Sequence, residues 1–126
     1  MEPFVFYSGA WGTVEAAMSA NGESPAKDFV EDLSDGERAK IDALFRRLGD
    51  NGPIVNVQKF KKIEGTLPPL YEFKSFQIRM PCFFMSGYRV VVTHGFKKQK
   101  DKIPASEVAK AQRIRVEHTS REGARK

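Results

Sequence analysis

The spacing of apolar residues changes along this chain from a helical to a β-strand pattern, and that change limits the folds that the chain can adopt. Ile41, Leu44 and Leu48 recur at the spacing of one face of an α-helix. Residues 70–74 alternate between apolar and polar side chains, and residues 88–94 are rich in valine, both of which are typical of β-strands. Helices and strands therefore occupy separate parts of the sequence, and this order predicts an α+β domain.

Capping residues mark two helices before the strands. Ser24 followed by Pro25 predicts a helix start, because serine caps the first turn and proline suits its first position. Ser34 precedes Glu37 by three positions, which is the spacing of a capping box. Since glycine and proline interrupt the helical pattern after this segment, we predict an antiparallel helical hairpin over residues 25–50.

The other elements are predicted from shorter patterns. We expect a first strand at residues 3–7 and a meander of three strands within residues 70–94. A last helix should begin at Pro104 and end near His118, followed by a flexible basic tail over residues 119–126. The expected sheet is twisted and antiparallel, with the helices packed mainly on one of its faces.

Length and cysteine content set further limits. A chain of 126 residues fits one domain, so we expect a single domain over residues 1–126. The one cysteine, Cys82, excludes an intramolecular disulfide, and His94 and His118 lack the spacing of a metal-binding motif. Because the sequence has no apolar run of about 20 residues and no signal-peptide pattern, we expect a cytoplasmic protein with no membrane segment, metal or cofactor.

Charge is distributed unevenly along the chain. The 21 basic and 16 acidic residues give a net charge of +5. Residues 1–58 carry ten acids and five bases, whereas residues 59–126 carry six acids and sixteen bases. This asymmetry indicates either a basic face that binds an anion such as nucleic acid, or a solvated basic face with a basic tail. Residues 12–24 show no clear pattern, and we predict neither a helix nor a strand for them.

Basic side chains gather around the predicted meander. They are Lys74, Arg79, His94, Lys97, Lys98, Lys100 and Lys102. If the strands are neighbours, Arg79 and His94 approach each other at one end of the sheet. Cations at that place could bind a phosphate or stabilise the transition state of phosphoryl transfer, and His94 could move a proton near neutral pH.

Each of these residues also has a structural interpretation. His94 at a strand end is more often structural than catalytic, and a run of lysines is more often a solvated loop. Glu72 could act as a general acid or base, or could face solvent on its strand. Cys82 lies in an apolar run and is expected to be a buried small residue. The aromatic residues of the meander are expected in the core and not as platforms for bases; they are Phe73, Phe76, Phe83 and Phe84.

Three segments in a fixed order resemble a known family. They are residues 70–80 (LYEFKSFQIRM), residues 91–98 (VVTHGFKK) and residues 102–111 (KIPASEVAKA). Together they resemble the phage-derived, HigB-like branch of the RelE/ParE toxin superfamily, and the resemblance extends over about residues 67–118. Each segment is weakly specific by itself, whereas the ordered set is fairly specific.

The resemblance implies a compact RelE-like fold and a toxin of a type II toxin–antitoxin pair. Such toxins commonly cleave mRNA in the ribosomal A site without a metal, by attack of the 2′-hydroxyl on the adjacent phosphate. By position, Arg79 resembles the phosphate-binding arginine of the family, and His94 lies near a position that other branches give to an aromatic or histidine. The resemblance thus implies that Arg79, His94 and Lys97 are catalytic, with Glu72 as a possible acid or base.

The resemblance also implies binding partners. The RNA backbone would be held by four lysines: Lys74, Lys98, Lys100 and Lys102. The partners would be mRNA, the ribosome with its rRNA, and a cognate helix-turn-helix antitoxin, through which alone the complex would bind operator DNA. Two alternatives are a ParE-like poison that binds DNA gyrase and a non-catalytic interaction module of the same fold.

Overall fold

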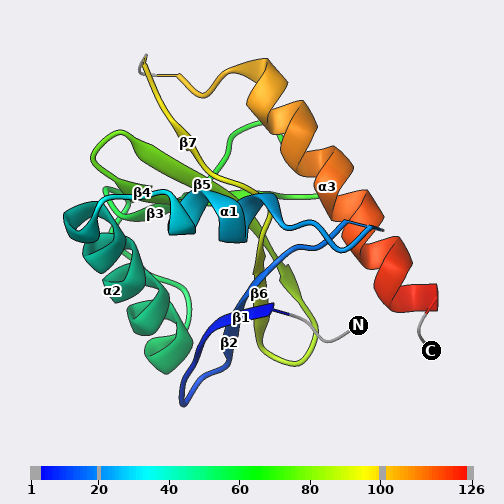
Figure 1. Cartoon of the computed structure of the whole chain (residues 1–126), viewed down its shortest axis with the longest axis horizontal. Helices are drawn as coiled ribbons and strands as arrows, with labels where there is room; N and C mark the ends of the chain where they lie inside the picture. The colour runs from blue at the N-terminus through cyan, green and yellow to red at the C-terminus, as the bar shows by residue number, and fades with distance from the viewer. Residues whose placement is uncertain (1–3, 20, 100–101, 125–126) are drawn as a thin grey trace.

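The computed structural model describes residues 4–19, 21–99 and 102–124. Its elements form one mixed sheet with helices on both sides (Figure 1). In chain order they are β1 (Phe4–Ser8), β2 (Thr13–Ala16), α1 (Pro25–Glu31), α2 (Asp35–Asn51), β3 (Phe60–Lys62), β4 (Tyr71–Ser75), β5 (Ile78–Met85), β6 (Arg89–Val92), β7 (Phe96–Lys97) and α3 (Ala105–Ala124). The α+β class is therefore confirmed, and none of these helices is long and apolar enough to span a bilayer.

The sheet contains one parallel pair among antiparallel ones. Its strand order is β1-β2-β6-β5-β4-β3, and β7 pairs with β5 beyond the end of β6. β2 and β6 run parallel, with Thr13 opposite Arg89 and Ala16 opposite Val92. An entirely antiparallel sheet was the wrong expectation, because the segment without a predicted element contains β2, which lies between β1 and β6.

The two predicted helices of the N-terminal half are present with the predicted caps. The Ser24 side chain accepts a hydrogen bond from the backbone N–H of Lys27. At the start of α2, both hydrogen bonds of the Ser34–Glu37 capping box are formed. Because these caps satisfy N–H groups that no helical carbonyl can reach, they fix where each helix begins.

The helices pack on both faces of the sheet. α1 and α2 cover one face, where Phe45 of α2 contacts Phe73 of β4 with ring centroids 5.1 Å apart. α3 covers part of the other face, where Ala111 and Ile114 belong to the same buried cluster as Phe83. The expectation that the helices lie mainly on one face therefore holds for α1 and α2, whereas α3 lies on the other face.

α3 is longer than the sequence predicts. It continues past His118 to Ala124, because His118 is buried against the sheet and its Nδ1 accepts a hydrogen bond from the backbone N–H of Met18. The predicted flexible tail over residues 119–126 is thus helical as far as Ala124, and its last two residues lie outside the described part of the chain.

Pro81 lies inside β5 at the break between β6 and β7. A proline lacks the N–H that an interior strand needs, so the ladder is interrupted there. The Pro81 carbonyl instead accepts hydrogen bonds from the backbone N–H and the hydroxyl of Thr93, at 2.9 Å and 3.1 Å. A side chain at Gly95 would overlap Phe29 of α1, since an added Cβ would lie 2.2 Å from the Phe29 ring. β6 and β7 therefore both run antiparallel to β5, with the register shifted by one residue between them.

Candidate active site

Basic side chains surround a hollow on the part of the sheet that α3 leaves open. We call it the cationic hollow; its volume is about 330 Å³, and it is lined by Lys61, Ile63, Glu64, Glu72, Lys74, Lys98, Lys102 and Ile103. β3, β4 and β5 place its charged residues side by side, since Lys61 lies opposite Glu72 and Lys74 lies opposite Arg79. Phe73, between Glu72 and Lys74, points to the other face and packs in the core.

Glu72 and Arg79 form a buried but incomplete ion pair beside the hollow. Their side chains are 6% and 11% exposed, and Nε of Arg79 lies 3.7 Å from Oε1 of Glu72. This distance is too long for a hydrogen bond, and neither atom has another partner among the described residues. Arg79 is oriented by its Nη1, which donates to the carbonyls of Phe76 and Ile78. Since buried polar atoms are almost always hydrogen-bonded, this donor and this acceptor carry hydrogen-bonding capacity that the described residues leave unused.

The environment shifts the protonation of two residues in the hollow. Burial raises the pKa of Glu72, and the nearby charges of Arg79 and Lys74 only partly oppose this shift. Burial also lowers the pKa of Lys74, and the positive charges of Lys61 and Arg79 lower it further. A carboxylate with a raised pKa and an ammonium with a lowered pKa are better suited to exchange protons near neutral pH than ordinary ones.

Two adjacent lysines of the predicted site point to opposite faces of the sheet. Lys98 lines the cationic hollow. Lys97 lies opposite Ile78 of the core face, and its Nζ forms an ion pair with Oε2 of Glu37 in α2, at 3.0 Å. The structure therefore brings Lys98, but not Lys97, together with Arg79.

His94 is buried behind the hollow and does not line it. Only 1% of the residue is exposed, and burial lowers its pKa. Its Nε2 lies 3.0 Å from Oε1 of Glu107 in α3, and its Nδ1 lies 3.0 Å from the Thr93 hydroxyl. Because a carboxylate only accepts, Nε2 carries the proton toward Glu107. The ring also stacks on Phe96, which lies opposite Arg79 in the sheet. His94 thus links the sheet to the first turn of α3.

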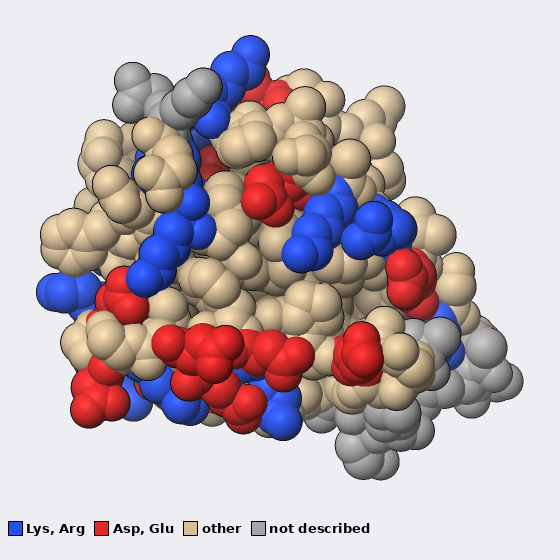
Figure 2. All heavy atoms as spheres, turned by 45° about the horizontal axis from the view of Figure 1, so that its top comes forward, with Lys and Arg blue, Asp and Glu red and all other residues tan. Residues whose placement is uncertain are grey.

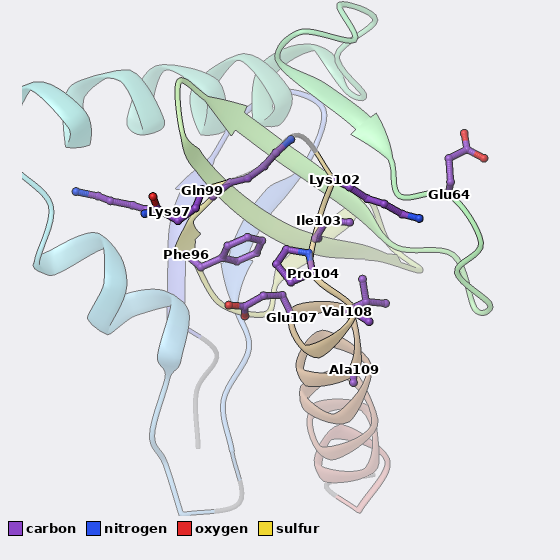
Figure 3. Close-up of a pocket in the computed structure, with 12 residues that line it drawn as sticks. Glu64, Phe96, Lys97, Gln99, Lys102, Ile103, Pro104, Glu107, Val108 and Ala109 are labelled. Atoms are coloured by element: carbon purple, nitrogen blue, oxygen red, sulfur yellow. The ribbon is translucent and has the colours of Figure 1, made fainter.

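A wider groove of about 950 Å³ adjoins the hollow between β7 and the start of α3 (Figure 3). Lys102 lines both spaces and extends toward the side on which Glu64 lies, whereas Lys97 extends to the other side. The predicted RNA-binding residue Lys100 lies outside the described residues. In the part of the chain that the structure describes, no three side chains of histidine, cysteine, aspartate or glutamate cluster as a metal site would require.

The sequence analysis missed Lys61, which lies opposite Glu72 in the sheet. The available signal was the alternation of Lys59, Phe60 and Lys61, in which one buried aromatic separates two exposed lysines. Acidic side chains gather elsewhere, and Figure 2 shows a band of them over the region of α1.

Comparison with known proteins identifies the family of this chain. A search of curated proteins found no match. The family described as "Phage derived protein Gp49-like (DUF891)" matches residues 28–116, which is more than two thirds of the chain. The match includes the cationic hollow and both residues of the incomplete ion pair. This family is associated with the toxins of toxin–antitoxin systems, which also indicates an antitoxin partner. The chain belongs to the phage-derived Gp49-like family of toxin-antitoxin-related toxins.

Proposed function

We propose that this protein is a type II toxin of the HigB-like RelE branch and that it cleaves mRNA bound to the ribosome. The observation that carries the proposal is the buried ion pair of Glu72 and Arg79, which keeps an unpaired acceptor and an unpaired donor beside a ring of lysines. A phosphodiester and its neighbouring 2′-hydroxyl need one acceptor for a proton and several donors for the phosphate oxygens.

The proposed reaction needs only the RNA and the side chains of the hollow. The ionised carboxylate of Glu72 takes the proton of the 2′-hydroxyl, whose oxygen attacks the adjacent phosphorus. As the new P–O2′ bond forms, the P–O5′ bond breaks, and the ammonium of Lys74 gives its proton to the leaving 5′ oxygen. The products are a 2′,3′-cyclic phosphate and a 5′-hydroxyl. Arg79 stabilises the charge that develops on the phosphate oxygens.

The remaining predicted residues have different roles in this proposal. Lys98 and Lys102 bind the RNA backbone together with Lys61, and Lys100 remains a predicted member of the same group. His94 is a positioning residue, because its contacts with Phe96 and Glu107 fix the strand break beside Arg79.

Lys97 belongs to the other sheet face and is proposed to contact RNA only outside the hollow.

The expected partner is a helix-turn-helix antitoxin encoded beside the toxin. An acidic segment of it would cover the cationic hollow, and operator DNA would be bound only through this antitoxin. The toxin would act in the cytoplasm, where mRNA and ribosomes are.

The test is inducible expression followed by mapping of new 5′ ends on cellular mRNA. We expect cuts within codons for the wild type and none for Arg79→Ala. Arg113→Ala is the matched control, because Arg113 is an exposed arginine of α3 whose partner is Glu117. A fall in DNA supercoiling with intact mRNA would instead support a gyrase poison, and normal growth without cuts would support a non-catalytic module.

A further inference from the structure

Phe76 occupies a position that neither packing nor backbone preference explains. It lies at the tip of the turn between β4 and β5, and 80% of the residue is exposed. The expectation that Phe76 is a core residue is therefore wrong. Its φ is +54°, at the first central position of a two-residue hairpin turn, where glycine is favoured. A strained and exposed aromatic residue indicates a role in binding.

The charged residues near the Phe76 ring are two lysines and one glutamate. The Nζ of Lys40 in α2 lies 5.3 Å from the ring centroid. A second hollow, of about 410 Å³, is lined by Glu37, Lys40, Ser75, Phe76, Gln77, Ile78 and Lys97. Glu37 is paired with Lys97, so the exposed ring and the Lys40 ammonium together suit a ligand that combines a flat apolar surface with negative charge, as a nucleotide does.

The turn is directly connected to the proposed reaction site. Nη1 of Arg79 donates to the Phe76 carbonyl. Lys74 and Arg79 are paired across the hairpin, and a single further pair of residues separates them from the turn. A phosphate bound beside Arg79 would therefore lie close to the turn that carries Phe76.

We propose that the Phe76 ring is a stacking platform for one base of the RNA next to the phosphate that is cleaved, with Lys40 and Lys97 beside the backbone of that nucleotide. This inference rests on the proposed function and adds to it the group that orients the RNA. Stacking on an aromatic ring tolerates every base, so Phe76 contributes affinity and position without strict sequence preference.

The test measures binding of an RNA oligonucleotide that spans a mapped cut and carries a 2′-deoxy nucleotide at the attacking position. Phe76→Gly removes the ring and suits the backbone of the turn, so we expect the fold to be kept while affinity falls about 5- to 150-fold. Phe76→Tyr should restore binding. Tyr88→Gly is the matched control, because Tyr88 is 66% exposed, has a φ of +60° and lies at the turn before β6.

Abasic oligonucleotides separate stacking from a structural effect. In the wild type, removal of one particular base should weaken binding by a factor similar to that of Phe76→Gly, and in Phe76→Gly its removal should have no further effect. If Phe76→Gly binds like the wild type while Arg79→Ala does not, the stacking proposal is wrong and the proposed function stands. Equal sensitivity of wild type and variant at every abasic position, or loss of antitoxin binding alone, also overturns it. If the wild type neither cuts nor binds RNA, both proposals fail.

Discussion

Two arginine–glutamate clusters lie on the same face of the sheet, and they differ in how completely they are hydrogen-bonded. Arg89 of β6 contacts Glu15 at 2.8 Å and 3.0 Å and Glu122 of α3 at 2.5 Å and 3.0 Å. Arg79 of β5, in contrast, lies 3.7 Å from Glu72 without a hydrogen bond between them.

The difference follows from the position of α3. α3 covers the Arg89 end of the sheet and supplies Glu122, which completes the pairing of the guanidinium. The cationic hollow lies beside the Arg79 pair, and no carboxylate from α3 contacts Arg79 there among the described residues. A pair of the same residue types thus holds a helix in one place and leaves hydrogen-bonding capacity for a ligand in the other.

The largest effect on cleavage is expected when Arg79, the arginine without a hydrogen-bonded glutamate, is replaced. Arg79→Ala should lower cleavage about 1,000-fold, because it removes the group that stabilises the transition-state phosphate. The free energy of unfolding should fall less than in Arg89→Ala, because the variant loses two hydrogen bonds to backbone carbonyls but no hydrogen bond to a carboxylate. Cleavage kinetics and urea unfolding measure the two effects. A large loss of stability with unchanged cleavage would make Arg79 a structural residue.

The opposite result is expected at Arg89. Arg89→Ala leaves the carboxylates of Glu15 and Glu122 without their main partner and should destabilise the fold by about 3 kcal/mol. Urea unfolding measures this change, and the folded fraction should keep its cleavage rate. Loss of cleavage in a fully folded Arg89→Ala protein would contradict the division of roles.

The protonation of Glu72 should make both the stability of the fold and the cleavage rate depend on pH. Because burial raises its pKa, the folded protein holds a proton there that the unfolded chain has released, so stability falls as pH rises through the range above the ordinary glutamate pKa. Glu72→Gln should remove this decrease in unfolding experiments. Because the ionised carboxylate is the proposed base, the cleavage rate of the wild type should rise with pH. Glu72→Gln should abolish this rise and lower cleavage about 100-fold. A variant with the same pH–rate profile as the wild type would exclude Glu72 as the base.

The two buried histidines should produce a smaller effect of opposite sign. Burial lowers the pKa of His94 and of His118, so below their ordinary pKa of about 6.5 the unfolded chain binds more protons and stability falls as pH decreases. His94→Gln and His118→Gln should each flatten this decrease in urea titrations between pH 5 and 7, values chosen around that pKa. An unchanged slope in both variants would exclude the histidines as its cause.

The smallest effect is expected at Lys97. Lys97→Ala removes a surface ion pair with Glu37 and should cost about 0.2 to 1 kcal/mol. It should also weaken RNA binding less than Lys98→Ala does, because only Lys98 faces the cationic hollow. Salt titrations of RNA affinity compare the two variants, and a larger effect of Lys97→Ala would place the RNA on the other face.

The sequence predicts the parts of this molecule whose signals are local. The caps at Ser24 and Ser34 depend only on neighbouring residues, and the alternation of residues 70–74 correctly separates Glu72 and Lys74 from the buried Phe73. These signals were enough to predict the α+β class and the gathering of basic residues around the meander, but the pairing of Glu72 with Arg79 was not predicted.

The features that were wrongly predicted depend on distant contacts. β2 contains only Thr-Val-Glu-Ala and exists because it pairs with β1 and β6. The break at Thr93–Gly95 shifts the alternation by one residue, so that Lys97 faces the core side and Lys98 faces the hollow. Since one residue of shift moves a side chain to the other face, no local pattern distinguishes the two lysines.

The parallel pairing of β2 with β6 also determines when this protein can fold on the ribosome. Thr13 pairs with Arg89, 76 positions later in the chain. At usual rates of translation, synthesis of that separation takes about 4 to 15 seconds, during which β1 and β2 lack their neighbour in the sheet. Arg79, Lys98 and α3 also emerge in this late part of the chain. The complete sheet and the cationic hollow therefore form only after residues 89–103 have been synthesised, and a nascent chain that ends before them carries neither.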